Sequence, residues 1–486
     1  MPTKTNNFAE IIGALPNICG EEKDVLKHSD PKVPQYAPVS DIAFDQIQAS
    51  FGVALHMHQP TIPAGGDHLQ SAGLISNLQF MFEHQDIKDN HNAPVFVQCY
   101  SRMSDIIRDL VDQGKSPRIM LDYSGNLLWG LRQMGQGEVL ENLKKVTCDK
   151  KYFRNVEWLG TTWSHAVVTS TPVPDIRLQI MAWRHHFASI FGWKALERVK
   201  GFSPPEMHLP IHPDVCYEYV KALKECGYQW ILVQEHTIEN ADGSGIRNRH
   251  FPHRLVAKNS QGDSQEIAIL IKTQGSDNKL IGQMQPYYEA QTLQRQDANG
   301  HNVPCFVCQI GDGENGGVMM NEFPPAYNKA YHDGGIGRVP GLNGSEYLEL
   351  ILAAGVREKD FEPVQPISQH RIWQNIGSPK KGAADEAIDK IKSQDPNYNL
   401  DKGSWTNDKN WVKGYEDVMD PINHLSAAFH KKVDGAKIDT GSAAYRKALL
   451  LLLISQTSCF RYWGSGAWTD YAKEICRRGQ EAIKAL

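Results

Sequence analysis

The fold is decided around one short stretch, Val199–Pro210, which reads VKGFSPPEMHLP. Val199, Gly201 and Phe202 have the composition of the end of a short strand. The two prolines that follow end any strand ladder, because proline has no amide hydrogen to donate. Glu206 then comes directly after the strand, with apolar neighbours on both sides. A carboxylate held in this way is typical of an enzyme site, although a glutamate in a surface loop has the same local pattern.

Apolar runs alternate with helical segments on both sides of this stretch. Seven runs have the composition of buried strands, namely 51–57, 118–123, 156–160, 200–202, 230–234, 266–272 and 303–310. Helical periodicity lies between several of them and ends at a glycine, as in 102–113 and 213–226. Mostly apolar strands that alternate with helices predict a parallel sheet covered by helices. Seven such units in about 260 residues favour a closed or nearly closed barrel over an open sheet.

The pattern divides the 486-residue chain into three parts. Residues 1–50 are polar and predict an N-terminal extension on the surface, with a short helix near Phe8–Leu15. Residues 51–344 hold the alternating strands and helices and predict a catalytic (β/α)7 barrel. Residues 345–486 hold long helical stretches and predict an all-helical C-terminal domain packed against the barrel.

Composition excludes several classes of function. A net charge of −5 argues against nucleic acid as the main partner, because phosphate binding needs a basic face. The longest aliphatic run, Ala448–Ile454, is too short to cross a membrane, and no signal-peptide pattern opens the sequence. The 9 cysteines are odd in number and lack framework spacing. They predict reduced thiols and therefore a cytoplasmic location.

Polar side chains follow the predicted strands at the points where the strands end. They are His56–Pro60, Gly160–His165, Glu206, Gln234–His236 and the turn Gly311–Gly317. In a β/α barrel the loops at the carboxyl ends of the strands converge on one mouth, so we expect these five sets to meet there.

Two of these sets leave more than one interpretation open. His56 and His58 are two residues apart, so both side chains lie on one face of a strand. They can donate to sugar hydroxyls, bind a metal, or form a satisfied histidine pair at a strand end. Asp312 lies between two glycines, which let a backbone approach a ligand closely, but Asp-Gly is also a common turn pair.

Glu206 and Asp312 belong to the fourth and seventh predicted strands and are expected to face each other across the mouth. Two facing carboxylates suggest glycoside hydrolysis. One attacks the anomeric carbon as nucleophile, and the other protonates the departing oxygen and then activates water. The acid needs a raised pKa, which burial among aromatic side chains would supply.

These motifs resemble those of glycoside hydrolase family 57. The four similar segments are His56–Pro60 for a His-x-His-Gln-Pro motif, Gly160–His165 for a glycine followed by a Ser-His pair, Phe202–Glu206 for a Pro-Glu after an aromatic, and Asp312–Gly316 for Asp-x-Glu followed by glycine. Their order is that of the family, and the match spans residues 51–320. In the C-terminal part, Gly403–Trp405 and Tyr462–Gly466 resemble a further aromatic motif of the family.

The resemblance implies an incomplete seven-stranded barrel and a retaining mechanism without an obligatory metal or other cofactor. It implies Glu206 as the nucleophile and Asp312 as the general acid/base. The sugar-binding residues that it implies are His56, His58, Gln59, His165, Trp405 and Trp463. The implied substrates are α-glucans or oligosaccharides, as for α-amylases, 4-α-glucanotransferases and branching enzymes. Ala166 and Phe202 stand where the family often has proline and tryptophan, and both positions concern subsites rather than the carboxylates.

Two other functions fit parts of the pattern. A metal-dependent polysaccharide deacetylase would use His56, His58 and Asp312 as ligands of a metal that activates water. Against it, no His-x-x-x-His segment is well placed at a strand end. A non-catalytic glucan-binding barrel would not need the carboxylates Glu206 and Asp312, and both are present.

Overall fold

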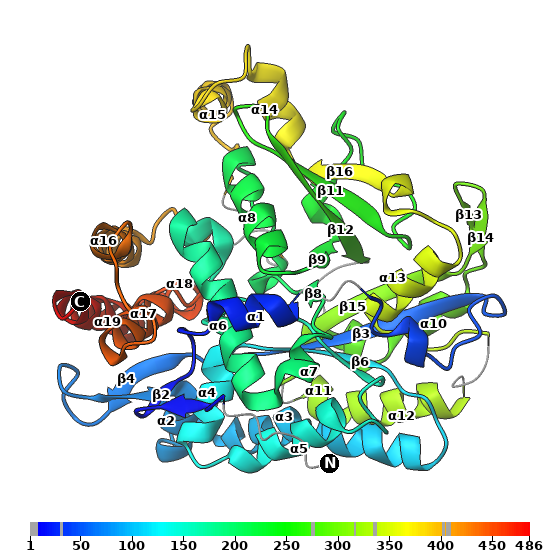
Figure 1. Ribbon diagram of the computed structural model, residues 1–486, viewed down its shortest axis with the longest axis horizontal. Coiled ribbons are helices and arrows are strands. Elements are labelled where there is room, and N and C mark those ends of the chain that lie inside the picture. Colours follow the sequence, from blue (N-terminus) through cyan, green and yellow to red (C-terminus); the bar gives the residue numbers. More distant parts are fainter. Residues whose placement is uncertain are drawn as a thin grey trace.

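The computed structural model of the chain describes residues 8–29, 33–273, 278–314, 317–333, 338–400, 404 and 410–486 (Figure 1). A mixed sheet lies at its centre. The seven predicted strands are present in it as β3 (Ala49–Met57), β6 (Ile119–Tyr123), β7 (Val156–Trp158), β8 (Gly201–Phe202), β9 (Trp230–Gln234), β12 (Ser264–Lys272) and β15 (Cys305–Asp312). Nearly every residue of β3, β6, β9 and β15 is buried, as expected for parallel strands covered on both faces.

The parallel pairings connect these seven strands in a continuous order. β3 pairs with β6, β6 with β7, β8 with β9, β9 with β12, β12 with β15, and β15 with β3. A single parallel bridge between Gly160 and Phe202 links the segment after β7 to β8. The β12–β15 contact likewise rests on one register pair, Lys272 with Cys308. Followed in this order, the pairings lead from β3 back to β3.

Helices follow the strands and cover the sheet. The main ones are α3 (Ala93–Asp112), α4 (Gly125–Gln133), α5 (Gly137–Cys148), α6 (Val173–Phe191), α8 (Pro213–Glu225) and α12 (Phe323–Asp333). Helix α4 begins directly after β6, because the Ser124 side chain accepts a hydrogen bond from the Leu127 amide and caps the helix. This cap fixes the chain immediately beside the carboxyl end of β6.

The N-terminal segment differs from the prediction. Instead of a helix near Phe8–Leu15, two short strands, β1 (Ile11–Ile12) and β2 (Leu15–Pro16), pair antiparallel. Gly13 and Ala14 both have positive φ, at 56° and 68°, and form the two-residue turn. Such a turn matches the twist of a hairpin, and its positive φ values are incompatible with a right-handed helix. The helix of this region comes later, as α1 (Glu22–Ser29).

The C-terminal part is mostly helical. It contains α13 (Gly344–Ala353), α14 (Gln369–Asn375), α15 (Ala383–Gln394), α16 (Glu416–Val433), α17 (Ala443–Ser455), α18 (Cys459–Tyr462) and α19 (Ala467–Lys484). Helices α16, α17 and α19 pack against one another at one side of the molecule (Figure 1).

The prediction that residues 345–486 are all-helical is wrong at one strand, β16 (Glu362–Pro366). It pairs parallel with β11 (His253–Lys258) and antiparallel with β10 (Ile238–Glu239). Prolines at 363 and 366 exclude a helix here, and each half of the strand pairs on one side only, which proline tolerates. β11 itself forms the antiparallel hairpin with β12.

One hydrophobic cluster joins the sheet to the C-terminal helices, with members from Ile18 to Ile483. A small second cluster lies between α14 and α15 and includes Ile372 and Ile388. Within the part of the chain that the structure describes, no helix is both long and apolar enough to cross a membrane.

Candidate active site

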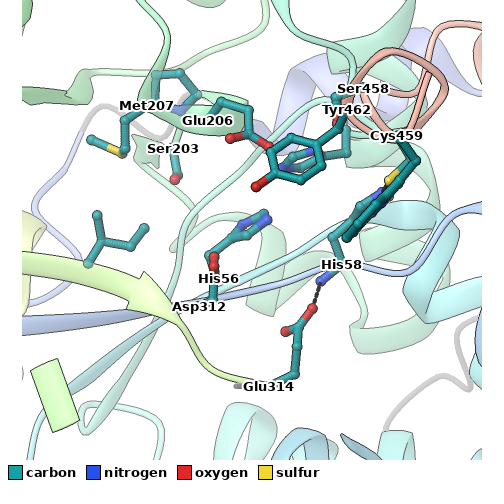
Figure 2. Close-up of a pocket in the computed structure, with 14 residues that line it drawn as sticks. His56, His58, Ser203, Glu206, Met207, Asp312, Glu314, Ser458, Cys459 and Tyr462 are labelled. Atoms are coloured by element: carbon teal, nitrogen blue, oxygen red, sulfur yellow. Dashed lines mark hydrogen bonds between the residues drawn. The ribbon is translucent and has the colours of Figure 1, made fainter. Parts of the chain in front are cut away.

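A cavity of about 240 Å³ opens where β3, β8 and β15 end (Figure 2). It is lined by His56, His58, His165, Ser203, Pro204, Glu206, Met207, Ile310, Asp312, Glu314, Ser458, Cys459, Tyr462 and Trp463. These residues come from three strand ends, from the loop after β7 and from the segment around α18. The cavity is therefore built at the sheet edge where the sequence predicts the site, with one wall supplied by the C-terminal part.

Most of the predicted site residues come together here. Glu206, Asp312, His56, His58, His165 and Trp463 all line the cavity. Gln59 does not line it, because its buried side chain donates to Tyr100 Oη (3.2 Å) and accepts from Asn77 Nδ2 (3.0 Å). Trp405 lies outside the described residues, as do the last two residues of the motif Asp312–Gly316.

Glu206 is held in an unusual backbone conformation. It lies in the short turn Pro205–Met207 after β8, with φ 58° and ψ 19°. Met207 also has positive φ, at 50°, and so does His165, which lines the same cavity, at 60°. A non-glycine residue in this region costs about 1–2 kcal/mol, so the surroundings must enforce it. Strain of this kind collects at functional sites, which favours a working role for this turn over that of a plain surface loop.

His56 lies in a row of three titratable side chains that crosses the sheet. In the register of the parallel strands it stands opposite Asp122 of β6 on one side and Asp312 of β15 on the other. Its Nδ1 donates to Asp122 Oδ2 at 2.8 Å, and Asp122 is fully buried. Burial alone lowers the pKa of His56, but Asp122, Asp312 and Glu314 outweigh it and raise the pKa to about 10. His56 is therefore an imidazolium ion at neutral pH.

The other two histidines of the cavity are neutral. The rings of His58 and His165 stack with centroids 4.3 Å apart, and His165 lies 4.6 Å from the ring of His56. Burial, and then the neighbouring histidines, hold the pKa of both rings well below the ordinary value. Ser458 Oγ lies 2.7 Å from His165 Nδ1. His165 Nε2 is buried and has no hydrogen-bond partner among the described residues.

Two carboxyl groups share the wall at the end of β15. Burial raises the pKa of Asp312, although His56 and a hydrogen bond from Asn278 oppose the change. Burial also raises the pKa of Glu314 to about 8, against the opposing effect of His56 and with a contribution from Asp312. Glu314 Oε1 accepts from the His58 amide at 3.1 Å (Figure 2). Because two buried carboxyls in one site resist ionising together, this wall retains a proton near neutral pH.

Several residues of the site were not predicted. Asp122 ends β6 at the level of His56, so a polar residue at a strand end was the available signal for it. Glu314 belongs to the predicted turn Gly311–Gly317, and it lines the cavity as expected, but no separate role was predicted for it. Ser458 and Cys459 come from the segment between α17 and α18, where no strand end marks them. The predicted set Gln234–His236 does not line the cavity.

Two residues of the predicted set Gln234–His236 have partners away from the cavity. Glu235 pairs with Arg249 at 3.1 Å, and His236 Nε2 donates to the Ser404 carbonyl at 2.9 Å. Among the described residues, no group of three or more His, Cys, Asp or Glu side chains is arranged to hold a metal ion.

Comparisons with known proteins concern the family and the fold. The model of glycosyl hydrolase family 57 matches residues 53–275, which include the ends of β3 and β8 with His56 and Glu206. No curated protein matches the chain in sequence. The 4-α-glucanotransferase of Thermococcus litoralis is similar in structure, with 15% identity, 84% of this chain covered and a TM-score of 0.51. The chain spans 53% of the length of that enzyme.

Two branching enzymes of family 57 are similar to the same degree. Those of Thermococcus kodakaraensis and Pyrococcus horikoshii each show 12% identity and a TM-score of 0.51, with 89% of this chain and 88% of theirs covered. At these identities the likeness concerns the fold. The family match confirms the predicted resemblance: residues 53–275 match the model of glycosyl hydrolase family 57.

Proposed function

We propose that the protein is a retaining glycosidase or transglycosylase of α-glucans, with Glu206 as the nucleophile and Asp312 as the general acid/base. One observation carries the proposal: both carboxylates line a single cavity together with His56, His58 and His165. The family match supports the reaction class. The similar structures are a glucanotransferase and two branching enzymes, which supports α-glucans as substrates.

We also infer that the seven parallel strands form an incomplete (β/α)7 barrel that presents this cavity at its mouth. The pairings that lead from β3 back to β3 support a barrel. Two weak joins support its incompleteness, namely the single bridge between Gly160 and Phe202 and the single register pair between Lys272 and Cys308. The boundaries at residues 51 and 344, and the helical C-terminal domain packed against the barrel, stay part of this proposal.

In the first step Glu206 attacks the anomeric carbon of the bound sugar. The bond to the leaving oxygen breaks as an ester bond to Glu206 forms, and Asp312 gives its proton to the leaving oxygen. In the second step Asp312 takes a proton from water or from a sugar hydroxyl, whose oxygen attacks the anomeric carbon and releases Glu206. The configuration at the anomeric carbon is retained because it inverts twice.

The surroundings of the two carboxylates fit these roles. Burial raises the pKa of Asp312, which favours the protonated form that the first step needs. The His56 imidazolium and the partner-free Nε2 of His165 can hydrogen-bond sugar hydroxyls, and Trp463 offers a ring face beside the same cavity. Figure 2 shows Glu206 on one side of the cavity and Asp312 and Glu314 on the other, with His56 between them in this view.

The nucleophile is tested by the variants Glu206→Gln and Glu206→Ala. We expect each to lose about 10³-fold or more in kcat with the fold unchanged by circular dichroism. Azide should restore turnover of an activated aryl α-glycoside by Glu206→Ala, because the small anion occupies the place of the lost carboxylate. Glucan turnover at the wild-type rate by Glu206→Gln would show that another group is the nucleophile.

Product analysis with maltooligosaccharides tests which acceptor the enzyme uses. Shorter sugars alone mean hydrolysis, a ladder of longer sugars means transfer, and new α-1,6 linkages mean branching. Tight binding without turnover of any α-glucan would instead favour the glucan-binding barrel.

A further inference from the structure

Asp122 is the buried end of the row that crosses the sheet. It is fully buried and does not line the cavity, so it cannot touch a sugar bound there. Its Oδ2 accepts from His56 Nδ1 at 2.8 Å, and its Oδ1 is buried without a hydrogen-bond partner in the described part of the chain. Whatever Asp122 does for a bound ligand it must do through His56.

We propose that Asp122 is a positioning residue of the reaction: it holds His56 as an imidazolium ring against Asp312 and thereby sets the protonation of the general acid/base. This inference rests on the proposed function, because it concerns the role given there to Asp312. The geometry that carries it is the register of three adjacent strands, which places Asp122, His56 and Asp312 side by side on β6, β3 and β15.

The charges around His56 show why one carboxylate matters. Asp122 faces it from β6, Asp312 from β15, and Glu314 from the turn after β15, and all three favour the protonated ring. The ring of His165 lies 4.6 Å from the His56 ring and stacks on that of His58, and both His58 and His165 are neutral. Of the three carboxylates only Asp122 is hydrogen-bonded to the ring in the structure. It is also the one that no substrate can displace, because it lies behind the cavity wall.

The charge of His56 acts on Asp312 in turn. Burial raises the pKa of Asp312, and the adjacent imidazolium lowers it. The charge of Asp122 also raises this pKa, but its effect is smaller than that of His56. A general acid/base must lose its proton in one step and regain it in the next, so its proton affinity must stay moderate. Without the positive charge, Asp312 would hold its proton to higher pH. The Asp122–His56 pair therefore keeps Asp312 able to act as base in the second step.

The test compares the pH dependence of kcat/KM for the wild-type chain and Asp122→Asn, using maltoheptaose as substrate. The basic limb reports the pKa of the general acid in the free enzyme. We expect it to move upward by about one pH unit in Asp122→Asn, because a neutral His56 no longer opposes the protonation of Asp312. Asp122→Glu keeps the charge and should leave the limb close to the wild-type position. A limb that stays in place or moves downward in Asp122→Asn overturns the proposal.

Ser124→Ala is the matched control. It removes a hydroxyl that lies two residues after Asp122 and 2.7 Å from His58 Nδ1, without changing any charge. The same hydroxyl caps helix α4. It can change the rate, but the basic limb should not move. An equal upward shift in Ser124→Ala would mean that any disturbance beneath the histidines has this effect, and would overturn the specific role of Asp122.

Histidine NMR separates this inference from the proposed function. In the wild-type chain we expect the His56 ring, assigned by the signal lost in His56→Gln, to stay protonated through neutral pH and to titrate near pH 10. In Asp122→Asn the His56 ring should titrate near or below neutral pH, because it has lost its hydrogen-bonded carboxylate. An unchanged titration overturns the inference whatever the activity assays give. Failure of the Glu206 variants overturns the proposed function and leaves the His56 titration as a separate result.

Discussion

Asp312 and Glu314 are two residues apart and line the same wall of the cavity. Substrates with different leaving groups can show which of the two carboxyl groups is the general acid. Asp312→Asn should lower the rate with maltooligosaccharides by about 10²–10⁴-fold, because their leaving oxygen needs a proton. The rate with a dinitrophenyl α-glycoside should fall much less, because dinitrophenolate leaves without a proton. Rates of the first turnover on both substrates measure this. Glu314→Gln is the matched control and should lose the same factor on both. If Glu314→Gln shows the dependence on leaving group and Asp312→Asn does not, then Glu314 is the acid.

Glu157 is a buried carboxyl that the proposed reaction does not use, and it makes stability depend on pH. Burial raises its pKa to about 8, although Ser345 donates two hydrogen bonds to it. Between its ordinary pKa and this value the unfolded chain releases the proton and the folded chain retains it, so stability falls as pH rises through that window. In Glu157→Gln the decrease in the free energy of unfolding between pH 5 and pH 8, measured by urea titration, should be smaller by about 3 kcal/mol. Glu358→Gln, at an exposed position, should leave this decrease as in the wild-type chain. If Glu157→Gln also shows the wild-type decrease, Glu157 is not its cause.

At the scale of the element, the strands of the central sheet were predictable because each is buried on both faces and therefore apolar throughout. The hairpin β1–β2 was not, because Gly13-Ala14 is a weak turn signal and its two strands are only two residues long. β16 was not predictable either, since its extended form depends on β10 and β11, which are distant in sequence. Tertiary pairing decides such short segments.

The same distinction holds for the site. His56, Glu206 and Asp312 could be found because the carboxyl ends of parallel strands meet in one place. The role now proposed for Asp122 depends on the register between β3 and β6, which no single strand carries in its sequence. Ser458 reaches the cavity through the packing of α17 against the rest of the molecule, which no local pattern encodes.

Helix α16 is tied to α6 by a histidine whose charge depends on pH. His430 Nε2 lies 2.7 Å from Oδ1 of the buried Asp175, and this hydrogen bond is the main reason that the pKa of His430 is raised. A raised pKa means stability that is complete below the ordinary histidine value and is lost as pH rises through the folded one. His430→Gln should therefore lower the free energy of unfolding by about 1 kcal/mol more at pH 5.5 than at pH 9, measured by urea unfolding. His424→Gln, an exposed change on the same helix, should change the free energy of unfolding equally at both pH values. If the effect of His430→Gln does not vary with pH, it is inconsistent with this ion pair.

On the scale of the whole molecule, the C-terminal helices supply part of the candidate active site. Ser458, Cys459, Tyr462 and Trp463 supply one wall of the cavity, and the Ser458 amide donates to the His165 carbonyl at 3.1 Å. The hydrophobic cluster that contains β3 also contains α17 and α19. A unit built in this way cannot lose its C-terminal helices and keep its site intact.

This continuity predicts one cooperative unfolding transition instead of two. Loss of activity, tryptophan fluorescence and circular dichroism should coincide in urea, because the C-terminal helices share their core with the sheet. Leu452→Ala, at a fully buried position of α17, should lower the free energy of unfolding by about 2–5 kcal/mol and move all three midpoints together. Lys447→Ala, exposed on the same helix, should change it by less than about 0.5 kcal/mol. Leu452→Ala could instead move only an early transition in circular dichroism, with activity lost at higher urea. The C-terminal part would then be an independently folding domain, and the two parts of the chain on either side of residue 344 would unfold separately.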